Sequence, residues 1–265
     1  MVTGTGEGEL LRRAGVQLDV QGAVATVTLN RPEVKNAQTP ATWAALRAAG
    51  ANLSQDVRVV VVRGAGDSFS SGLDRRLLTP EGVDGEQSML ELMHAPSDEL
   101  AETIAGYQEG FTWLRRCGFV SIAAVQGHAI GAGFQLALSC DLRVLADDAR
   151  LSIREPLLGL VPDLTGTKPL VELVGYSRAL EICATGRVVT AEEAQELGLA
   201  TAVVPRAELD AAVADLVEAL TAPPHGAVRE TKALLQTAAA VDLDEQRRAE
   251  REAQVRRFRE LSGRD

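Results

Sequence analysis

The sequence has few cysteines and few histidines, and neither set is arranged for disulfide bonds or for metal binding. Cys117, Cys140 and Cys183 are odd in number, widely spaced and set among apolar neighbours. We therefore expect reduced core residues. The three histidines are equally scattered and form no His-x-x-x-His spacing. The sequence thus predicts no metal site.

The sequence also lacks long apolar runs and an excess of basic residues. No apolar run reaches the length of a membrane-spanning helix, and the N-terminus has no secretory apolar segment. The net charge of −10 has the wrong sign for binding nucleic acid or an anionic membrane. We expect a soluble, cytoplasmic protein without a membrane span and without a nucleic-acid partner.

The chain does contain enough apolar residues for a substantial core. They make up 46% of 265 residues, which suits one sizeable domain or one domain with an appendage. From Pro205 onward β-branched runs become rare, and Ala, Glu and Arg dominate. We expect a flexible N-terminus (1–14), a core (15–204) and a helical C-terminal segment (205–265).

One stretch, residues 120–136, has the pattern of a buried strand, a tight turn and a helix N-terminus. The apolar run from Ile122 to Val125 is followed by a breaker at Gly127. Around Gly131 and Gly133 there is almost no side chain, so a ligand can approach the backbone closely. The unpaired N–H groups of a helix start can stabilise negative charge there.

A second stretch has the same design. The apolar strand at 58–62 leads through a glycine-rich loop to Ser70-Ser-Gly-Leu-Asp74, and Asp74 can favour a helix start. Either loop alone is commonly a simple connection. Brought together, they offer two backbone N–H donors from separate parts of the chain, which is how an oxyanion hole is built.

Together these loops match a known pattern. Residues 70–74 resemble the Ala-Gly-x-Asp motif of the crotonase, or enoyl-CoA hydratase/isomerase, superfamily, and residues 127–135 (GHAIGAGFQ) resemble its second motif. The resemblance continues through 140–143, 155–163 and 185–194. It covers residues 15–205.

The resemblance implies an α/β fold, a crotonase-type spiral of repeated strand-strand-helix units followed by a helical C-terminal segment. In the family that segment helps to build trimers, often paired into hexamers. We therefore expect a homotrimer or a dimer of trimers. The sequence itself shows only amphipathic helices there.

The resemblance also implies a site for a coenzyme A thioester. By motif position, the N–H groups of Leu73 and Ala132 are the oxyanion-hole donors. Coenzyme A is part of the substrate, and no separate cofactor is implied. Lys35 is either a phosphate ligand or a solvated loop residue, and the arginines at 75 and 76 either meet phosphates or pair with a nearby acid. The residues implied to contact substrate or coenzyme A are Lys35, Ala37, Ser71, Gly72, Asp74, Arg75 and Gly131.

The carboxylates decide the reaction. Hydratases of the family use two glutamates, whose positions fall at Gln135 and Glu155 here. An amide can position water but neither takes nor gives a proton at neutral pH. Glu155, with a raised pKa beside an apolar wall, can act as general base, or it is a surface glutamate that starts a loop. Some isomerases of the superfamily use an acid at the position of Asp163, whereas many relatives carry Asp there without using it.

Residues 78–96 form a long segment without clear periodicity. Such a loop in a compact domain is usually functional or disordered. Met89, Leu90, Leu92 and Met93 can form one side of an acyl pocket. Alternatively they only pin the loop to the core.

Two hypotheses follow from these residues and from the resemblance. The first is an enzyme that acts on the acyl part of a fatty acyl-CoA by hydration or by double-bond isomerisation, with Glu155 as the principal acid/base, Gln135 in the place of the other glutamate, and Asp163 as a possible partner. The second is an acyl-CoA-binding protein with little or no turnover. The glutamine at 135 favours the second.

Overall fold

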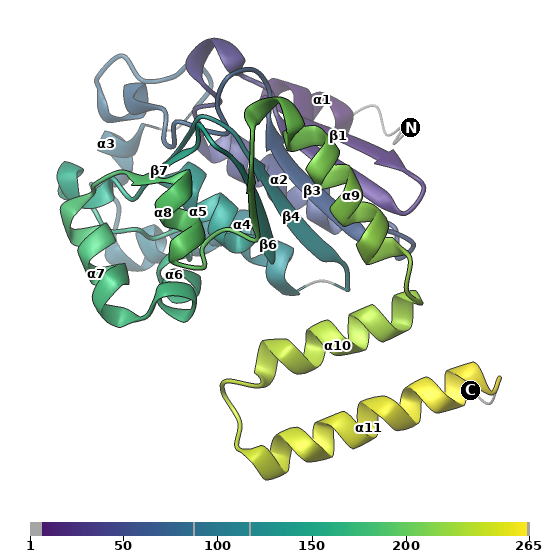
Figure 1. The fold of residues 1–265 in the computed structure, drawn as a ribbon. Helices are drawn as coiled ribbons and strands as arrows, with labels where there is room; N and C mark the ends of the chain where they lie inside the picture. Colours follow the sequence, from purple (N-terminus) through teal and green to yellow (C-terminus); the bar gives the residue numbers. More distant parts are fainter. Residues whose placement is uncertain (1–6, 87, 117, 264–265) are drawn as a thin grey trace.

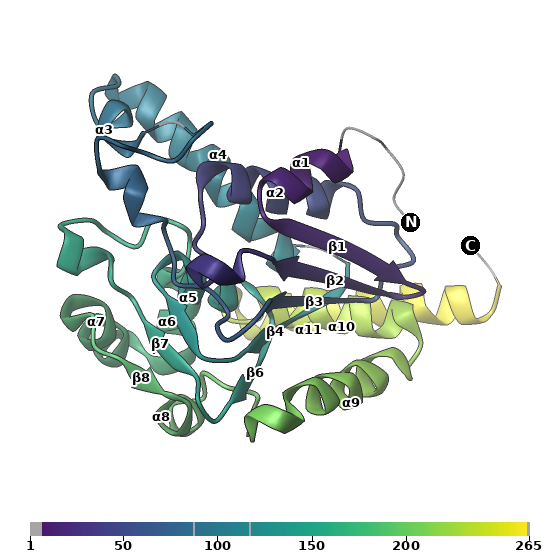
Figure 2. The same ribbon diagram turned by 90° about the horizontal axis from the view of Figure 1, so that it is seen from above.

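The computed structural model describes residues 7–86, 88–116 and 118–263, and two sheets organise it (Figures 1 and 2). The larger sheet has the strand order β1-β2-β3-β4-β6-β9. β1 and β2 form the antiparallel hairpin that the sequence predicted, and the other neighbours run parallel. The strands are β1 (Val16–Gln21), β2 (Val24–Leu29), β3 (Val59–Gly64), β4 (Val120–Val125), β6 (Leu142–Ala146) and β9 (Ala202–Val204).

The central strands are buried on both faces, which explains their continuous apolar sequences. In β3, Val60 and Val62 belong to the main core, which includes residues of α2 (Pro40–Ala51) and α4 (Ser97–Arg116). Val59 and Val61 face a second cluster, formed with α9 (Leu209–Thr221). Figure 2 shows α2 and α4 on one side of the sheet and α9 on the other.

A small sheet lies beside the large one and completes the strand-strand-helix pattern. It has the order β5-β7-β8, from β5 (His128–Ile130), β7 (Arg150–Ser152) and β8 (Val189–Thr190). β4 is followed by β5 and then by helix α5 (Ala132–Ser139). The predicted spiral unit is confirmed, but β5 lies where the sequence pattern predicts only a turn, because three residues show no periodicity.

Three helices begin at residues whose side chains cap them: α2, α8 (Ala191–Glu196) and α11 (Leu243–Leu261). The Thr39 side chain accepts from Thr42 N at the start of α2, with Pro40 as the first helical residue. Thr190 caps α8 and Asp242 caps α11 in the same way. Further α-helices are α3 (Met89–Leu92), α6 (Thr167–Val174), α7 (Tyr176–Thr185) and α10 (His225–Thr237).

Residues 7–14 differ from the flexible N-terminus expected over residues 1–14, of which residues 1–6 lie outside the described part of the chain. Glu7–Arg13 form helix α1, and Leu11 and Ala14 are buried in the main core. Ala14 O also accepts a hydrogen bond from the Thr42 hydroxyl at 3.1 Å. Residues 7–14 are therefore packed against α2 because a short apolar face is buried there, a signal too brief to stand out in the sequence.

The C-terminal segment is helical, as predicted, but its parts differ in how they contact the core. α9 packs against β3, β4 and β6. α10 and α11 form a pair that lies apart from the rest of the body (Figure 1). α10 is fastened to the core at Lys232, whose Nζ lies 2.6 Å from both Asp141 Oδ2 and Phe119 O.

Within the described part of the chain, no helix is long and apolar enough to cross a membrane. No cluster of three or more His, Cys, Asp or Glu side chains that could hold a metal occurs among the same residues. Cys140 and Cys183 are free, and Cys117 lies outside the described residues. The cytoplasmic location stays a prediction.

Candidate active site

Short backbone ladders hold the two glycine-rich loops side by side. Ser70 N donates to His128 O at 2.8 Å, and Ile130 N donates to Ser70 O at 3.0 Å. On the other side of the first loop, Gln38 N donates to Gly72 O at 2.7 Å. The loops that the sequence assigned to one site are therefore adjacent in space.

Two glycines allow this close approach. Gly72 has φ +83°, and a Cβ there would lie 2.4 Å from Ile130 O and 3.4 Å from Ala132 N. Gly131 has φ +53°, and a Cβ there would lie 3.1 Å from Glu155 Oε1. Only glycine combines this backbone conformation with the absence of a clash. Residues 72–73 consequently lie beside residues 130–132.

Leu73 and Ala132 line the same cavity. Ala132 is the first residue of α5, so its N–H has no acceptor inside the helix and lies at the positive end of the helix dipole. Among the described residues, the backbone hydrogen bonds of turns, loops and caps include none in which Leu73 N or Ala132 N is the donor. Two N–H groups at one cavity can both donate hydrogen bonds to a thioester oxygen.

The cavity has a volume of about 670 Å³ and is largely apolar. Met89, Leu92 and Met93 line it, in agreement with the pocket interpretation of residues 78–96, whereas Leu90 is not part of the wall. α4 forms the facing wall. Other apolar residues around the cavity are Leu78, Leu100, Ile104, Leu157, Leu158, Leu160, Val161 and Leu164.

Glu155 lines this cavity at the start of a 3-10 turn, Glu155–Leu158. Burial raises the pKa of its carboxyl above the usual value, although a hydrogen bond from Gln135 works against this rise. Its Oε1 accepts that bond from Gln135 Nε2 at 2.7 Å. Its Oε2 is buried and has no hydrogen-bond partner among the described residues. The alternative of a plain surface glutamate is therefore wrong.

Asp163 lines the same cavity. Burial raises the pKa of its carboxyl too, and its charge raises the pKa of Glu155. Its backbone oxygen accepts a hydrogen bond from Gln108 Nε2 at 2.7 Å. At this cavity, burial therefore disfavours the charged form of both acids.

Gln135 occupies a different position from the one expected of a water-binding residue. Its side chain is fully buried and is not part of the cavity wall. Its Oε1 accepts from Leu164 N at 2.9 Å and from Gly166 N at 3.2 Å, while its Nε2 donates to Glu155. The amide contacts Glu155 rather than the cavity because these backbone donors hold it there.

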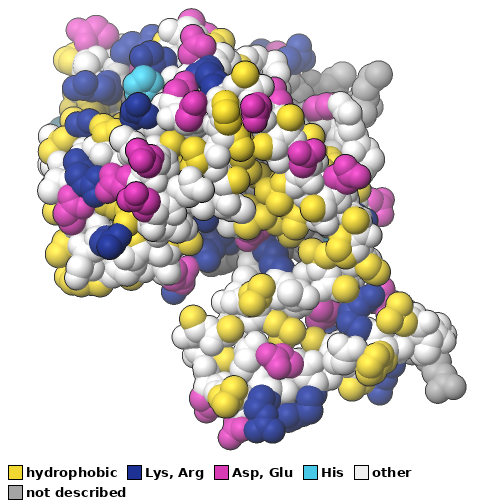
Figure 3. All heavy atoms as spheres, viewed as in Figure 1, with side chains coloured by type: hydrophobic (Ala, Val, Ile, Leu, Met, Phe, Trp, Pro, Cys, Tyr) yellow, Lys and Arg dark blue, Asp and Glu magenta, His cyan; other side chains and the backbone are white. Residues whose placement is uncertain are grey.

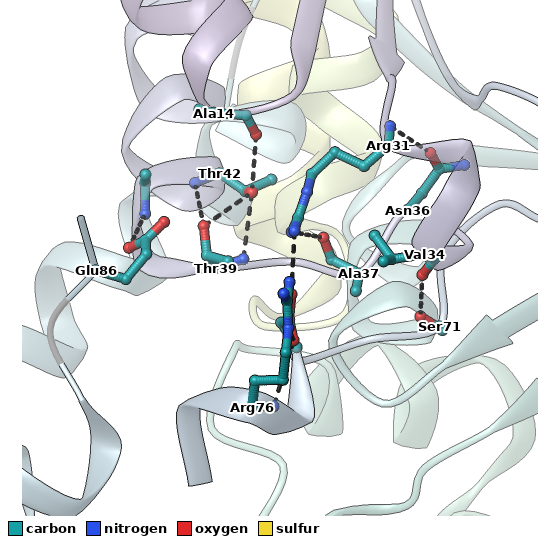
Figure 4. A network of polar contacts seen from close by, with 12 residues as sticks. Ala14, Arg31, Val34, Asn36, Ala37, Thr39, Thr42, Ser71, Arg76 and Glu86 are labelled. Carbon is teal, nitrogen blue, oxygen red and sulfur yellow. Dashed lines mark hydrogen bonds and ion pairs between the residues drawn. The ribbon is translucent and has the colours of Figure 1, made fainter. Parts of the chain in front are cut away.

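Asp74 is also placed differently from the substrate contact that the motif implied. Its carboxylate pairs with Arg31 at 3.1 Å and with Arg76 at 2.7 Å, and its side chain is 6% exposed. Figure 4 shows Arg31 and Arg76 extending toward one another from separate segments. The hydrogen bond from Arg76 is the main reason why the pKa of Asp74 is lowered to about 2. Asp74 is absent from the cavity wall. It fixes the loop instead.

The other implied coenzyme A contacts divide into two groups. Ser71, Gly72, Arg75 and Gly131 line the cavity. Lys35 and Ala37 do not, and Lys35 is exposed on the segment next to the first loop. Of the two arginines, Arg76 pairs with Asp74 and Arg75 is at the cavity.

Several wall residues were not identified from the sequence. Trp43 and Tyr107 line the cavity, with ring centroids 4.7 Å apart, and Arg154 lies beside Glu155. Leu100, Ile104 and Tyr107 recur with the spacing of one helix face in α4. That spacing was the available signal, but periodicity does not distinguish a core face from a cavity wall.

Residues 19–264 match the enoyl-CoA hydratase/isomerase family. The chain is 31% identical over 233 residues to the peroxisomal Delta(3,5)-Delta(2,4)-dienoyl-CoA isomerase of Arabidopsis thaliana. The aligned region covers 87% of this chain and 83% of that protein. It is 30% identical to the (E)-benzylidenesuccinyl-CoA hydratase of Thauera aromatica, over 82% of this chain and 80% of the relative. Isomerases and hydratases are thus both among the relatives.

Solved structures resemble the whole chain. A Thermobifida fusca YX protein in complex with acetoacetyl-CoA is 54% identical, with a TM-score of 0.92 over 96% of this chain and 98% of that one. A Thermobifida fusca YX protein in complex with CoA is also 54% identical, with a TM-score of 0.91 over 97% of this chain and 97% of that one. A Bacillus anthracis enoyl-CoA hydratase is 28% identical, with a TM-score of 0.77 over 90% of this chain and 89% of that one.

Proposed function

Because the chain belongs to the enoyl-CoA hydratase/isomerase family, we propose that it moves a carbon–carbon double bond along the acyl chain of an acyl-CoA thioester. One observation favours double-bond isomerisation over hydration. The two carboxyls that line the cavity belong to Glu155 and Asp163, whereas the residue in place of the other hydratase glutamate is a buried amide that cannot transfer a proton.

In the proposed reaction, one carboxylate removes a proton from the carbon next to the thioester carbonyl. The electron pair moves onto the carbonyl oxygen, where the N–H groups of Leu73 and Ala132 stabilise the enolate. The other carboxyl, protonated, delivers a proton to a more distant carbon of the conjugated chain as the double bond shifts. No atom is gained or lost overall, and burial raises the pKa of both acids, which favours the protonated form that the donating acid needs.

The coenzyme A part of the substrate is proposed to extend from the first loop toward solvent. Arg75 at the cavity and the exposed Lys35 are the cations suited to its phosphates. They provide local positive charge in a chain whose net charge is −10. The backbone at Ser71 and Gly72 borders the same path.

The proposal is tested by assaying three reactions: isomerisation of a 3-enoyl-CoA, isomerisation of a 3,5-dienoyl-CoA and hydration of crotonyl-CoA. We expect wild-type protein to isomerise at least one of the first two substrates faster than it hydrates the third. Glu155→Gln and Asp163→Asn should each lose about 100-fold or more in kcat while still binding acyl-CoA. Faster hydration than isomerisation, or full activity in both variants, would exclude the proposed chemistry.

The second candidate function is binding of acyl-CoA without efficient turnover, and the buried amide at 135 favours it. Calorimetry with acyl-CoA ligands of several chain lengths separates the two. Binding without any product supports a binding protein. No affinity for any coenzyme A compound would remove both candidates.

We also propose that the chain assembles into a homotrimer or a dimer of trimers through its C-terminal helices. Leu235 and Leu243 are 71% and 74% exposed, and Phe258 and Leu261 are 63% and 72% exposed. Figure 3 shows hydrophobic side chains spread over this helical pair at the bottom of the view. Apolar side chains of this size on one helical pair are typical of a surface that another chain covers.

A further inference from the structure

The side chain of Gln135 connects the two carboxyl-bearing segments of the cavity. Its Nε2 donates to Glu155 Oε1 at 2.7 Å. Its Oε1 accepts from Leu164 N at 2.9 Å and from Gly166 N at 3.2 Å, directly after Asp163 in the chain. A single buried amide therefore contacts one acid and the backbone that carries the other.

We propose that Gln135 is a positioning residue for both acids: it selects Glu155 Oε2 as the reacting oxygen, and it fixes the loop that presents Asp163. This inference rests on the proposed isomerase function and deepens it. The glutamine is then not a lost catalytic group but a part that the carboxyl pair requires.

The first step of the argument concerns Glu155. Its Oε1 is occupied by the amide donor, and it packs on Gly131, where a Cβ would lie 3.1 Å from Oε1 and 3.6 Å from Oε2. Its Oε2 is buried with no hydrogen-bond partner among the described residues, on a side chain that lines the cavity. An unpaired buried carboxylate oxygen is costly unless a ligand meets it. The hydrogen bond to Oε1 leaves Oε2 to exchange the proton.

The second step concerns the loop after Asp163. Thr165 has φ +69°, a left-handed conformation that is rare for a β-branched residue. The two N–H groups on either side of it, from Leu164 and Gly166, converge on the amide oxygen of Gln135. Gly166 packs so closely that a Cβ there would lie 2.7 Å from Gln135 Cγ. The amide oxygen thus stabilises an unusual turn next to Asp163.

An amide satisfies both contacts without taking or giving a proton. An ionised glutamate at 135 could still accept from the two backbone N–H groups, but it could not donate to Glu155, and two carboxylates would face each other. A methionine of similar size could do neither. Gln135→Glu and Gln135→Met therefore separate the effect on Glu155 from the effect on the loop.

Other titratable or charged groups near Glu155 can also affect the pKa of its carboxyl. They are Asp163 at the same cavity, the Cys183 thiol on α7, and Arg154, the preceding residue in the chain. None of them is changed in the two variants. Any difference between wild type and Gln135→Met therefore reports the loss of the amide at 135, and Gln135→Glu adds the effect of a second carboxylate.

We expect the acid limb of the pH profile of kcat/KM to move to higher pH in both variants, because the donor that favours ionised Glu155 is lost. The kcat of Gln135→Met should fall about 100-fold, with little change in acyl-CoA affinity. Amide hydrogen exchange at Leu164 and Gly166 should accelerate in Gln135→Met but stay slow in Gln135→Glu. Gln126→Met is the matched control: it removes another buried amide, with bonds to Gly64 O and Gly66 O away from both acids.

A second readout does not depend on turnover. Carbon-13 NMR of glutamate-labelled protein, with the Glu155 signal identified by its loss in Glu155→Gln, should show a higher pKa for Glu155 in both Gln135 variants. If wild type is inactive but this titration shifts, the inference stands and the proposed function fails. If wild type is active and neither the titration nor the pH profile differs from that of Gln126→Met, the inference is wrong.

Discussion

At the residue scale, the candidate site places two acids where burial disfavours their charge. Burial raises the pKa of Glu155 and of Asp163 in the folded protein. Between the unfolded and folded pKa values, the folded state then binds more protons than the unfolded state. Stability therefore falls as pH rises through this window above about 4, and both acids destabilise the fold at neutral pH.

The first prediction follows from that sign. Glu155→Gln should raise the free energy of unfolding at pH 7, because it removes a buried charge and keeps a side chain that can accept from Gln135. The gain should disappear below about pH 4, where the glutamate is protonated in both states. Urea unfolding across this range measures the difference. The exposed Glu218→Gln is the control, and an equal gain for it at pH 7 would refute the explanation.

Asp74 gives a prediction of the opposite sign. Its pKa is lowered to about 2, first of all by the hydrogen bond from Arg76, so its stabilising effect is present above the unfolded value near 3.8 and is lost as pH falls toward 2. Asp74→Asn should cost about 1–3 kcal/mol at pH 7, since Arg31 then loses its charged partner. Denaturant titration at pH 7 and at pH 2 measures this. A penalty that persists unchanged at pH 2 would contradict it.

The family motifs predicted which residues share a cavity better than they predicted where the side chains point. Leu73, Ala132, Glu155 and Asp163, which the motifs assign to one site, line one cavity. It did not foresee that Asp74 pairs with Arg31, because that partner lies 43 residues away in sequence. The direction of a polar side chain is set by tertiary donors and acceptors, which one sequence does not reveal.

At the element scale, the predictable features were those with strong periodicity or capping. The apolar runs at 58–62 and 122–125 became β3 and β4, and Ser97–Arg116 is a single helix as expected. The short strand β5 and helix α1 were missed, because three to seven residues give too few repeats for a period to be recognised. They are held by contacts with distant segments instead.

Helix α4 sets one wall of the cavity, and this permits a prediction about acyl chain length. Ile104→Trp should fill part of the cavity and raise KM for long acyl-CoA substrates by about tenfold or more, with a smaller effect on short ones. Steady-state kinetics over a series of chain lengths measures the effect. Ala105→Trp places the same indole side chain on the exposed face of α4 and should leave the series unchanged. Parallel changes in both variants would show that the wall does not select chain length.

At the scale of the whole molecule, the large sheet and its helices form one body, and α10 with α11 lies apart from it (Figure 1). The spiral architecture could be predicted through the family motifs. How far the C-terminal helices stand from the core could not, because their sequence shows only amphipathic and highly charged helices.

The proposed assembly is tested at this scale. Light scattering after size-exclusion chromatography should give a mass of three or six chains of 28.1 kDa. The double variant Phe258→Asp with Leu261→Asp should shift the protein toward smaller species, because both side chains are largely exposed on α11 in the single chain. The exposed polar pair Arg248→Asp with Glu252→Lys is the control. A wild-type monomer would refute the proposal.

The most direct test of the account is a crystal structure of the protein with an acyl-CoA that does not turn over. The account predicts that the thioester oxygen lies about 2.7–3.1 Å from both Leu73 N and Ala132 N. It also predicts that the carboxyls of Glu155 and Asp163 face the acyl carbons. A thioester oxygen that contacts only one of these two nitrogens, or an acyl chain outside the cavity between α3 and α4, would contradict it.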